Sequence, residues 1–166
     1  MVRHLMMRKI GQLDWRMPYM KVLAGALLWA LLTGIGPFER WPGGRLAGPV
    51  QDQVITDWRF VESAGRCAVE VRPLFPHSVT VNCWHHEGQL YVGCMQCENK
   101  IWSEYISVWP DARVRIASKV YPVHFSRVMS SVETEQSWRA RWLNLGRSLP
   151  AASIPDHYWL FRVASR

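Results

Sequence analysis

The chain has 166 residues, of which 49% are hydrophobic and 20% are charged, and its formal net charge is +7. This length is that of one domain of ordinary size, and the composition excludes wholesale disorder. Four Cys are too few for a small fold held together mainly by disulfides, whereas ten Trp indicate a well-filled core or a stacking surface.

An apolar run near the N-terminus predicts a membrane segment. Residues 22–38 carry no charge, and as a helix they would span about 26 Å, close to the thickness of a thin hydrocarbon core. The flank at residues 1–21 has five basic residues and one acid, so the positive-inside rule predicts a cytoplasmic N-terminus. We therefore expect a single-pass transmembrane helix with the rest of the chain on the outer, extracytoplasmic side. A cleaved secretory signal and a buried core helix stay open as alternatives.

Most of the positive charge belongs to that flank. About +3 is left for residues 22–166, and no basic stripe interleaved with aromatic residues occurs. The sequence therefore predicts no binding to nucleic acid.

The region beyond the apolar run divides into a lead-in and a domain. Residues 39–56 are expected to be a linker, because the stretch 36–50 holds three Pro and four Gly. Residues 57–166 are expected to form the domain, and a short helix is predicted over residues 57–63, where Asp57 is a plausible N-cap.

Alternating polar and apolar residues predict six strands in this domain. They lie at 66–72, 77–85, 90–94, 113–116, 119–128 and 158–163. The first three form an antiparallel meander, with a tight turn at Glu87–Gly88. Helical spacing predicts a short helix over 100–108 and an amphipathic helix over 132–147. Because open antiparallel sheets expose their edges, we expect a small closed β-barrel with helices at its ends.

Three short motifs of this region are informative because of their order. They are Gly88-x-Leu90-Tyr91-Val92, Lys100-Ile101-Trp102 and Pro110-Asp111-Ala112-Arg113-Val114. In this order, over roughly residues 57–129 and with a closing strand at 158–163, they resemble the pyridoxamine 5'-phosphate oxidase-like flavin split barrels. The resemblance includes the deazaflavin-dependent nitroreductase-like relatives, and it implies a mainly β, split-barrel fold.

The resemblance also implies a homodimer with a flavin, FMN or a deazaflavin, between the subunits. Lys100 matches the basic residue that binds the cofactor phosphate, and a cation at a helix N-terminus favours an anion there. Thr80, Asn82 and Trp102 would line the cofactor. The expected function is that of an oxidoreductase acting on a small molecule. Because a flavin carries the reaction itself, no catalytic residue is named.

Two features depart from the family pattern. Many family members place an Arg on the second strand, whereas this strand offers Thr80, Asn82 and Trp84. Glu98, two residues before Lys100, would oppose a phosphate. Two alternatives to a flavin enzyme therefore stay open: a non-catalytic envelope barrel that binds a partner without a cofactor, and a haem-binding split barrel.

The cysteines offer several pairings. Cys94 and Cys97 form a CxxC motif, but no βαβ context supports a thioredoxin-like role. If Glu87–Gly88 closes the hairpin, Cys83 lies diagonal to Cys94, so a Cys83–Cys94 disulfide competes with a Cys94–Cys97 disulfide. Free thiols and redox chemistry also stay open. No metal site is predicted, because the turn residues His85 and His86 lie some 13–17 Å along the strands from Cys94.

Overall fold

Helix α1 (Pro18–Thr33) belongs to the first of two compact units, residues 1–32 and 33–166. The computed structural model describes residues 18–33, 36–63, 66–148 and 152–166, so most of the basic flank lies outside the described residues. No helix in these ranges is both long and apolar enough to cross a membrane. The transmembrane helix predicted over residues 22–38 is thus not found among the described residues.

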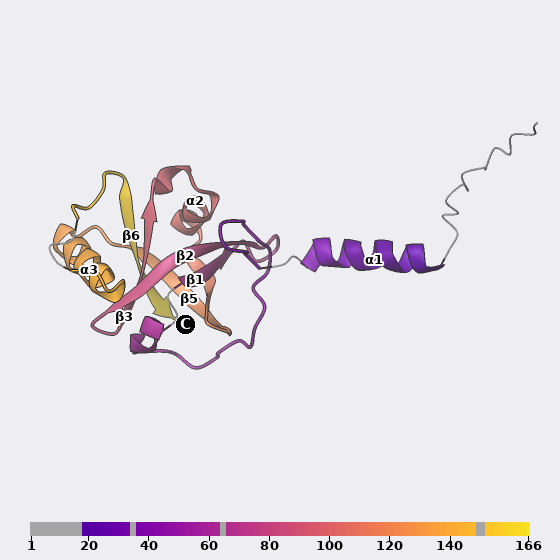
Figure 1. Cartoon of the computed structure of the whole chain (residues 1–166), viewed down its shortest axis with the longest axis horizontal. Coiled ribbons are helices and arrows are strands. Elements are labelled where there is room, and N and C mark those ends of the chain that lie inside the picture. Colours follow the sequence, from indigo (N-terminus) through magenta and orange to yellow (C-terminus); the bar gives the residue numbers. More distant parts are fainter. Residues whose placement is uncertain (1–17, 34–35, 64–65, 149–151) are drawn as a thin grey trace, which may run out of the picture. The chain divides into compact units, whose positions relative to one another are not determined.

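The second unit is a closed barrel of six antiparallel strands (Figure 1). In chain order they are β1 (Arg66–Val71), β2 (His77–His86), β3 (Gln89–Met95), β4 (Asp111–Ile116), β5 (Lys119–Arg127) and β6 (Tyr158–Ser165). Around the barrel the order is β1-β2-β3-β6-β5-β4, and β4 closes it by pairing with β1. The predicted mainly β barrel and its opening meander are thus confirmed.

Two helices of the second unit lie on different sides of the barrel (Figure 1). Helix α2 (Ile101–Val108) follows the short 3-10 helix η2 (Cys97–Asn99), and α3 (Ser131–Asn144) begins where Ser130 accepts a hydrogen bond from the Glu133 amide. The helix predicted over 57–63 is a 3-10 helix, η1 (Arg59–Ser63). The helix predicted over 132–147 ends earlier, because the chain turns with positive φ at Gly146.

Helix α3 covers the outer face of β2, β3 and β6. Trp84, Tyr91 and Leu160 are buried beneath it, and Ala140 of the helix packs on them. Side-chain hydrogen bonds fasten it to the strands: Trp84 Nε1 donates to Ser137 Oγ over 3.0 Å, and the Tyr91 hydroxyl donates to Glu133 Oε1 over 2.8 Å. This side of the barrel is therefore closed by packing.

The lead-in segment, defined here as residues 36–50, is irregular but tightly held by the barrel. Gly43 and Ser78 exchange two backbone hydrogen bonds of 2.8 Å, and the Leu46 amide donates to the carboxylate of Glu70 over 2.5 Å. Leu46 itself is buried against Ala68 and Val120. The segment expected to be a linker is thus part of the domain's packed surface, where it can contribute to a site.

One glycine of the lead-in segment is required by a close approach. Gly48 has a φ of +140°, and a Cβ atom there would lie 2.3 Å from the carbonyl oxygen of Ser118. No other residue fits this conformation without moving the β4–β5 turn. The crossing of the lead-in segment over the barrel therefore depends on the missing side chain.

Candidate functional site

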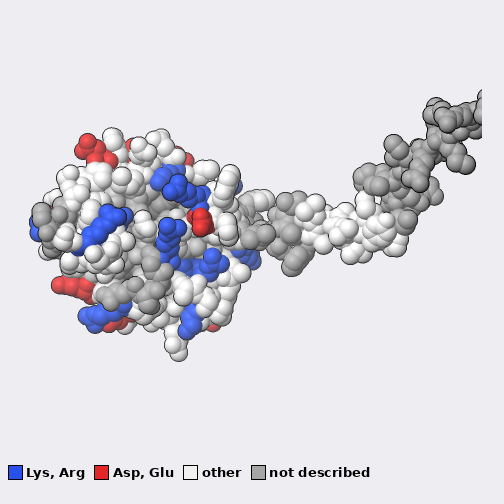
Figure 2. All heavy atoms as spheres, viewed as in Figure 1, with Lys and Arg blue, Asp and Glu red and all other residues white. Residues whose placement is uncertain are grey.

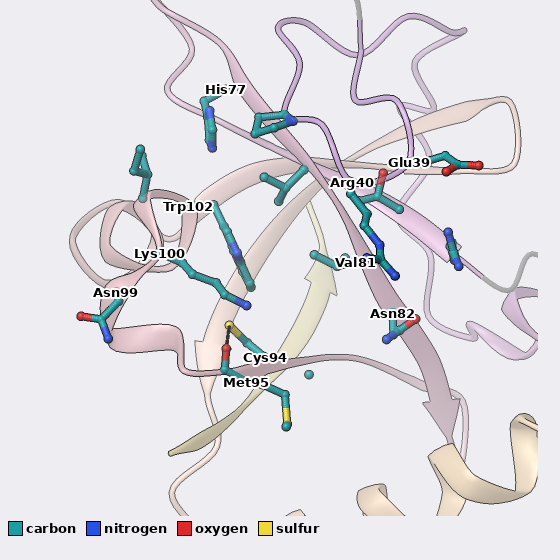
Figure 3. A pocket seen from close by; sticks show the side chains of 16 residues that line it. Glu39, Arg40, His77, Val81, Asn82, Cys94, Met95, Asn99, Lys100 and Trp102 are labelled. Carbon is teal, nitrogen blue, oxygen red and sulfur yellow. Dashed lines mark hydrogen bonds between the residues drawn. The ribbon is translucent and has the colours of Figure 1, made fainter. Parts of the chain in front are cut away.

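A pocket of about 600 Å³ opens beside the middle of β2 (Figure 3). Its walls come from β2, the end of β3, the junction of η2 and α2, and the lead-in segment. The four residues predicted to bind a cofactor, Lys100, Thr80, Asn82 and Trp102, all line this pocket. Residues up to 22 positions apart in the sequence are thus brought to one place.

Strand β2 supplies both polar and apolar groups to the pocket. Val79 and Val81 are partly buried and pack against the main core, while Thr80 and Asn82 add a hydroxyl and an amide. Asn82 is paired with Arg66 of β1 on one side and Gly93 of β3 on the other, and all three line the pocket. The barrel pairing therefore places Arg66 opposite Asn82 at the pocket wall.

The junction of η2 and α2 positions Lys100 and Trp102. The Lys100 carbonyl accepts hydrogen bonds from the amides of Ser103 and Glu104, which start α2, and the buried Ser103 hydroxyl donates to the Cys97 carbonyl. Trp102 is 4% exposed and its ring centroid lies 5.7 Å from that of Phe161. Its indole is therefore anchored in the core, and the Lys100 side chain reaches into the pocket beside it (Figure 3).

Positive charge prevails among the residues that line the pocket. The described lining includes three cations, Arg40, Arg66 and Lys100, and one carboxylate, that of Glu39. Glu98 does not line it, and its carboxylate lies 3.2 Å from Nδ1 of His157. The Glu98 carboxylate, which was expected to oppose an anion beside Lys100, is thus outside the described lining of the pocket and pairs with His157.

Arg40 and Arg66 are the two arginines among the described pocket residues, and sequence reasoning missed both. Arg40 comes from the lead-in segment and points along β2 toward Val81 and Asn82 (Figure 3). The register of the predicted meander could have indicated Arg66, since it lies opposite Asn82. No pattern in the sequence indicated Arg40, because its position depends on how the lead-in segment crosses the barrel.

These groups fit a phosphate-bearing, planar ring ligand. Guanidinium and ammonium groups bind phosphate through charge-assisted hydrogen bonds. The Thr80 hydroxyl and Asn82 amide can meet the polar edge of a ring, and Val79, Val81 and Trp102 offer apolar surface to its faces. The donor set of the pocket therefore suits a flavin phosphate.

The cysteines are paired in two disulfides, Cys67–Cys83 and Cys94–Cys97. Of the two predicted pairings, the CxxC pairing is present and the Cys83–Cys94 pairing is not, because Cys83 is joined to Cys67. Cys67 and Cys94 both lie diagonal to Cys83 on the inner face of the barrel. Hairpin geometry alone could therefore not choose between them.

The groups of the opposite side serve packing. Arg162 donates a bidentate hydrogen bond to Glu133, with distances of 2.7 and 2.6 Å, and this bond holds the pKa of the Glu133 carboxyl low. Burial, followed by the hydrogen bond to Glu133, raises the pKa of Tyr91 to about 12. None of the three lines the pocket. Among the described residues, no group of three or more His, Cys, Asp or Glu side chains could hold a metal ion.

His77 at the start of β2 lines the pocket and predicts a pH effect on stability. Its pKa is lowered, mainly because burial disfavours the imidazolium and also because of the positive charge of Arg72. The unfolded chain then binds more protons below the usual pKa of about 6.5, so acid destabilises the fold through this group. We expect the wild type to lose more stability between about pH 7 and about pH 5 than His77→Gln, measured by urea unfolding. Equal losses in both proteins would contradict this.

The comparisons with known proteins concern the fold. No family model matches the sequence, and no curated protein matches it. Campylobacter jejuni ChuZ is similar in structure, with a TM-score of 0.53 and 13% identity over 64% of this chain, which spans 50% of that protein. A candidate 5-nitroimidazole antibiotic resistance protein from Bacteroides thetaiotaomicron has a TM-score of 0.50 and 14% identity, over 68% of this chain and 82% of that one.

A third solved structure is a candidate pyridoxamine 5'-phosphate oxidase from Listeria innocua. Its TM-score is 0.49 and its identity 14%, over 63% of this chain and 86% of that chain. The likeness to ChuZ and to the Bacteroides protein concerns the fold, and at that level it agrees with the resemblance seen in the sequence.

Proposed function

We propose that this split barrel binds a flavin, FMN or a deazaflavin, in the pocket beside β2 and acts as an oxidoreductase on a small molecule. The observation that carries the proposal is the meeting of Lys100, Thr80, Asn82 and Trp102 in one pocket with two further cations. The fold shared with the pyridoxamine 5'-phosphate oxidase-like barrels supports it.

Each wall has a part in holding the ligand. Lys100, at the N-terminus of α2, and Arg40 bind the phosphate, so that Arg40 takes the place of the Arg that β2 lacks. Asn82 and Thr80 bind the polar edge of the ring, and Trp102 contacts its face. A bound flavin would supply two-electron transfer, while the protein orients it and limits the access of water.

The open side of the pocket favours a homodimer. Met95 and Ile101 line the pocket, yet their side chains are 50% and 57% exposed. A second copy of the chain would cover this apolar rim and complete the cofactor site. Arg40 and Asn82 are also exposed, and they would be desolvated by the same contact.

The expected result is a phosphate-dependent affinity for flavin. We expect the full-length protein to bind FMN more tightly than riboflavin, and Lys100→Gln or Arg40→Gln to weaken FMN binding about tenfold with little effect on riboflavin. Lys119→Gln is the matched control, because Lys119 is exposed at the start of β5 and does not line the pocket. Flavin fluorescence titrations measure the affinities, and light scattering measures the mass of the complex.

Other outcomes separate the alternatives. A folded protein that binds neither FMN, FAD nor a deazaflavin contradicts the proposal and favours a barrel that binds a partner. A Soret band on titration with haemin, without flavin binding, would favour a haem protein. His77 is the one imidazole among the residues lining this pocket, so His77→Gln tests whether it ligates the iron.

A further inference from the structure

One of the two disulfides forms part of the pocket wall. Cys94 lines the pocket together with Lys100 and Trp102, whereas Cys67, Cys83 and Cys97 do not. The Cys67–Cys83 disulfide joins β1 to β2 inside the core. A ligand in the pocket can therefore reach the sulfur of Cys94 and no other cysteine sulfur.

The surroundings of Cys94 suit a group that reacts. In Figure 3 its side chain points to the region between Lys100 and Met95, beneath the ring of Trp102. Lys100 and Trp102 therefore border both Cys94 and the space that a ligand would fill. Cys97 is fully buried, so it takes part in an exchange with the pocket only through its bond to Cys94.

The backbone around this disulfide is held independently of the S–S bond. The disulfide bridges residues three positions apart, at the end of β3. The Gln96 amide donates to the His157 carbonyl over 3.1 Å, and the Cys97 carbonyl accepts from the Lys100 amide over 3.1 Å and from the Ser103 hydroxyl. Opening the bond leaves all three hydrogen bonds and the β3–β6 pairing in place, so the barrel need not unfold.

We propose that Cys94–Cys97 is a redox disulfide that exchanges an electron pair with the flavin in the adjacent pocket. The inference rests on the proposed function. In one direction the reduced flavin gives up two electrons and one proton, the S–S bond breaks, and a second proton comes from water, which leaves two thiols and oxidised flavin. In the other direction the two thiols lose two electrons and two protons, the S–S bond forms, and the flavin is reduced. Cys94 is the sulfur that faces the flavin.

The two disulfides have different roles, one structural and one redox, because they lie in different places. Cys67–Cys83 lies away from the pocket wall and crosslinks two strands, so it remains oxidised throughout the exchange. The substrates that fit this chemistry are dithiols and disulfides small enough to enter a pocket of about 600 Å³, or oxidants that accept the pair from the flavin.

The test loads the full-length oxidised protein with one FMN and reduces the flavin anaerobically by light with EDTA. After alkylation under denaturing conditions, mass spectrometry of fragments cut at Glu87 counts the thiols. We expect two alkyl groups per chain, on Cys94 and Cys97, with Cys67–Cys83 intact. We also expect the rate of opening to be independent of protein concentration, because the reaction occurs within one complex.

The matched control is Cys94→Ser/Cys97→Ser, which keeps the pocket's shape and the other disulfide. In this variant the flavin should stay reduced, and no thiol should appear. If the wild-type flavin is reduced while Cys94–Cys97 remains closed, or if Cys67–Cys83 opens equally fast, the inference is wrong although the flavin site stands. If no FMN binds in the first step, the proposed function fails, and this is seen before any light is applied.

Discussion

Glu70→Gln is expected to lower the free energy of unfolding by about 3 kcal/mol. The Glu70 carboxylate is 5% exposed and binds Arg113 through three hydrogen bonds of 2.6 to 3.1 Å. It also accepts a hydrogen bond from the Leu46 amide. The variant therefore leaves a partly buried guanidinium without its counter-charge and weakens the hold on the lead-in segment. Urea or guanidinium unfolding measures the change.

An exposed ion pair is the control for this variant. Glu135 and Arg139 of α3 also form a salt bridge, with side chains 58% and 59% exposed. Solvent screens such a pair, and Glu135→Gln should change stability by only about 0.5 kcal/mol. If the two variants lose similar free energies of unfolding, the burial of the Glu70–Arg113 pair adds nothing to stability and the prediction is wrong.

The same contact links stability to the pocket. Arg40 and the hydrogen-bonded Gly43 belong to the lead-in segment that Glu70 holds through Leu46. A looser segment would place Arg40 less well against β2. Glu70→Gln is therefore also expected to weaken FMN binding more than riboflavin binding, as Arg40→Gln does. This effect would be indirect, because Glu70 does not line the pocket.

Loss of the Cys67–Cys83 disulfide is expected to be the second large effect. This disulfide closes a loop of 16 residues. Cys67→Ala/Cys83→Ala should lower the free energy of unfolding by about 3 kcal/mol, because the unfolded chain gains entropy. The Cys94–Cys97 disulfide closes a loop of only three residues. Cys94→Ala/Cys97→Ala should therefore lower the free energy of unfolding by only about 2 kcal/mol. Both pairs are buried, so the loss of packed sulfur is comparable, and denaturant unfolding of the two variants compares the loop terms.

The outcome also bears on where the barrel resides. We propose that it lies outside the cytoplasm, because structural disulfides persist in oxidising compartments. Alkylation of protein taken from its own cells without reductant should then leave Cys67 and Cys83 unmodified. Free thiols at these two positions would contradict both the crosslink and the location. The opposite order of the two stability losses would contradict the loop-length argument alone.

The strands followed from local patterns in the sequence, and the four residues found in the pocket followed from the family resemblance of the ordered motifs. Alternation of polar and apolar residues reports which face of a strand is buried, and this is decided within a few residues, as in Val79 to Cys83. The helix at Lys100 was also expected from the spacing of its apolar residues, but its buried face holds Trp102, Ser103 and Ile106, while Ile101 is exposed. Figure 2 shows, consistent with the composition, basic and acidic side chains spread over the visible barrel surface, with more of the former.

Other features were decided only by the tertiary structure, because they depend on contacts between distant segments. Cys83 has a cysteine diagonal to it on each neighbouring strand, and only the folded barrel shows that Cys67 is its partner. Glu70 meets Arg113 because β4 closes the barrel against β1, and closure is a property of all six strands together. Arg40 reaches the pocket because the lead-in segment is fastened across the barrel at Gly43 and Leu46. The sequence by itself thus determined the local elements and the motif residues, while the long-range pairings determined the disulfides, the buried ion pair and the added charge of the site.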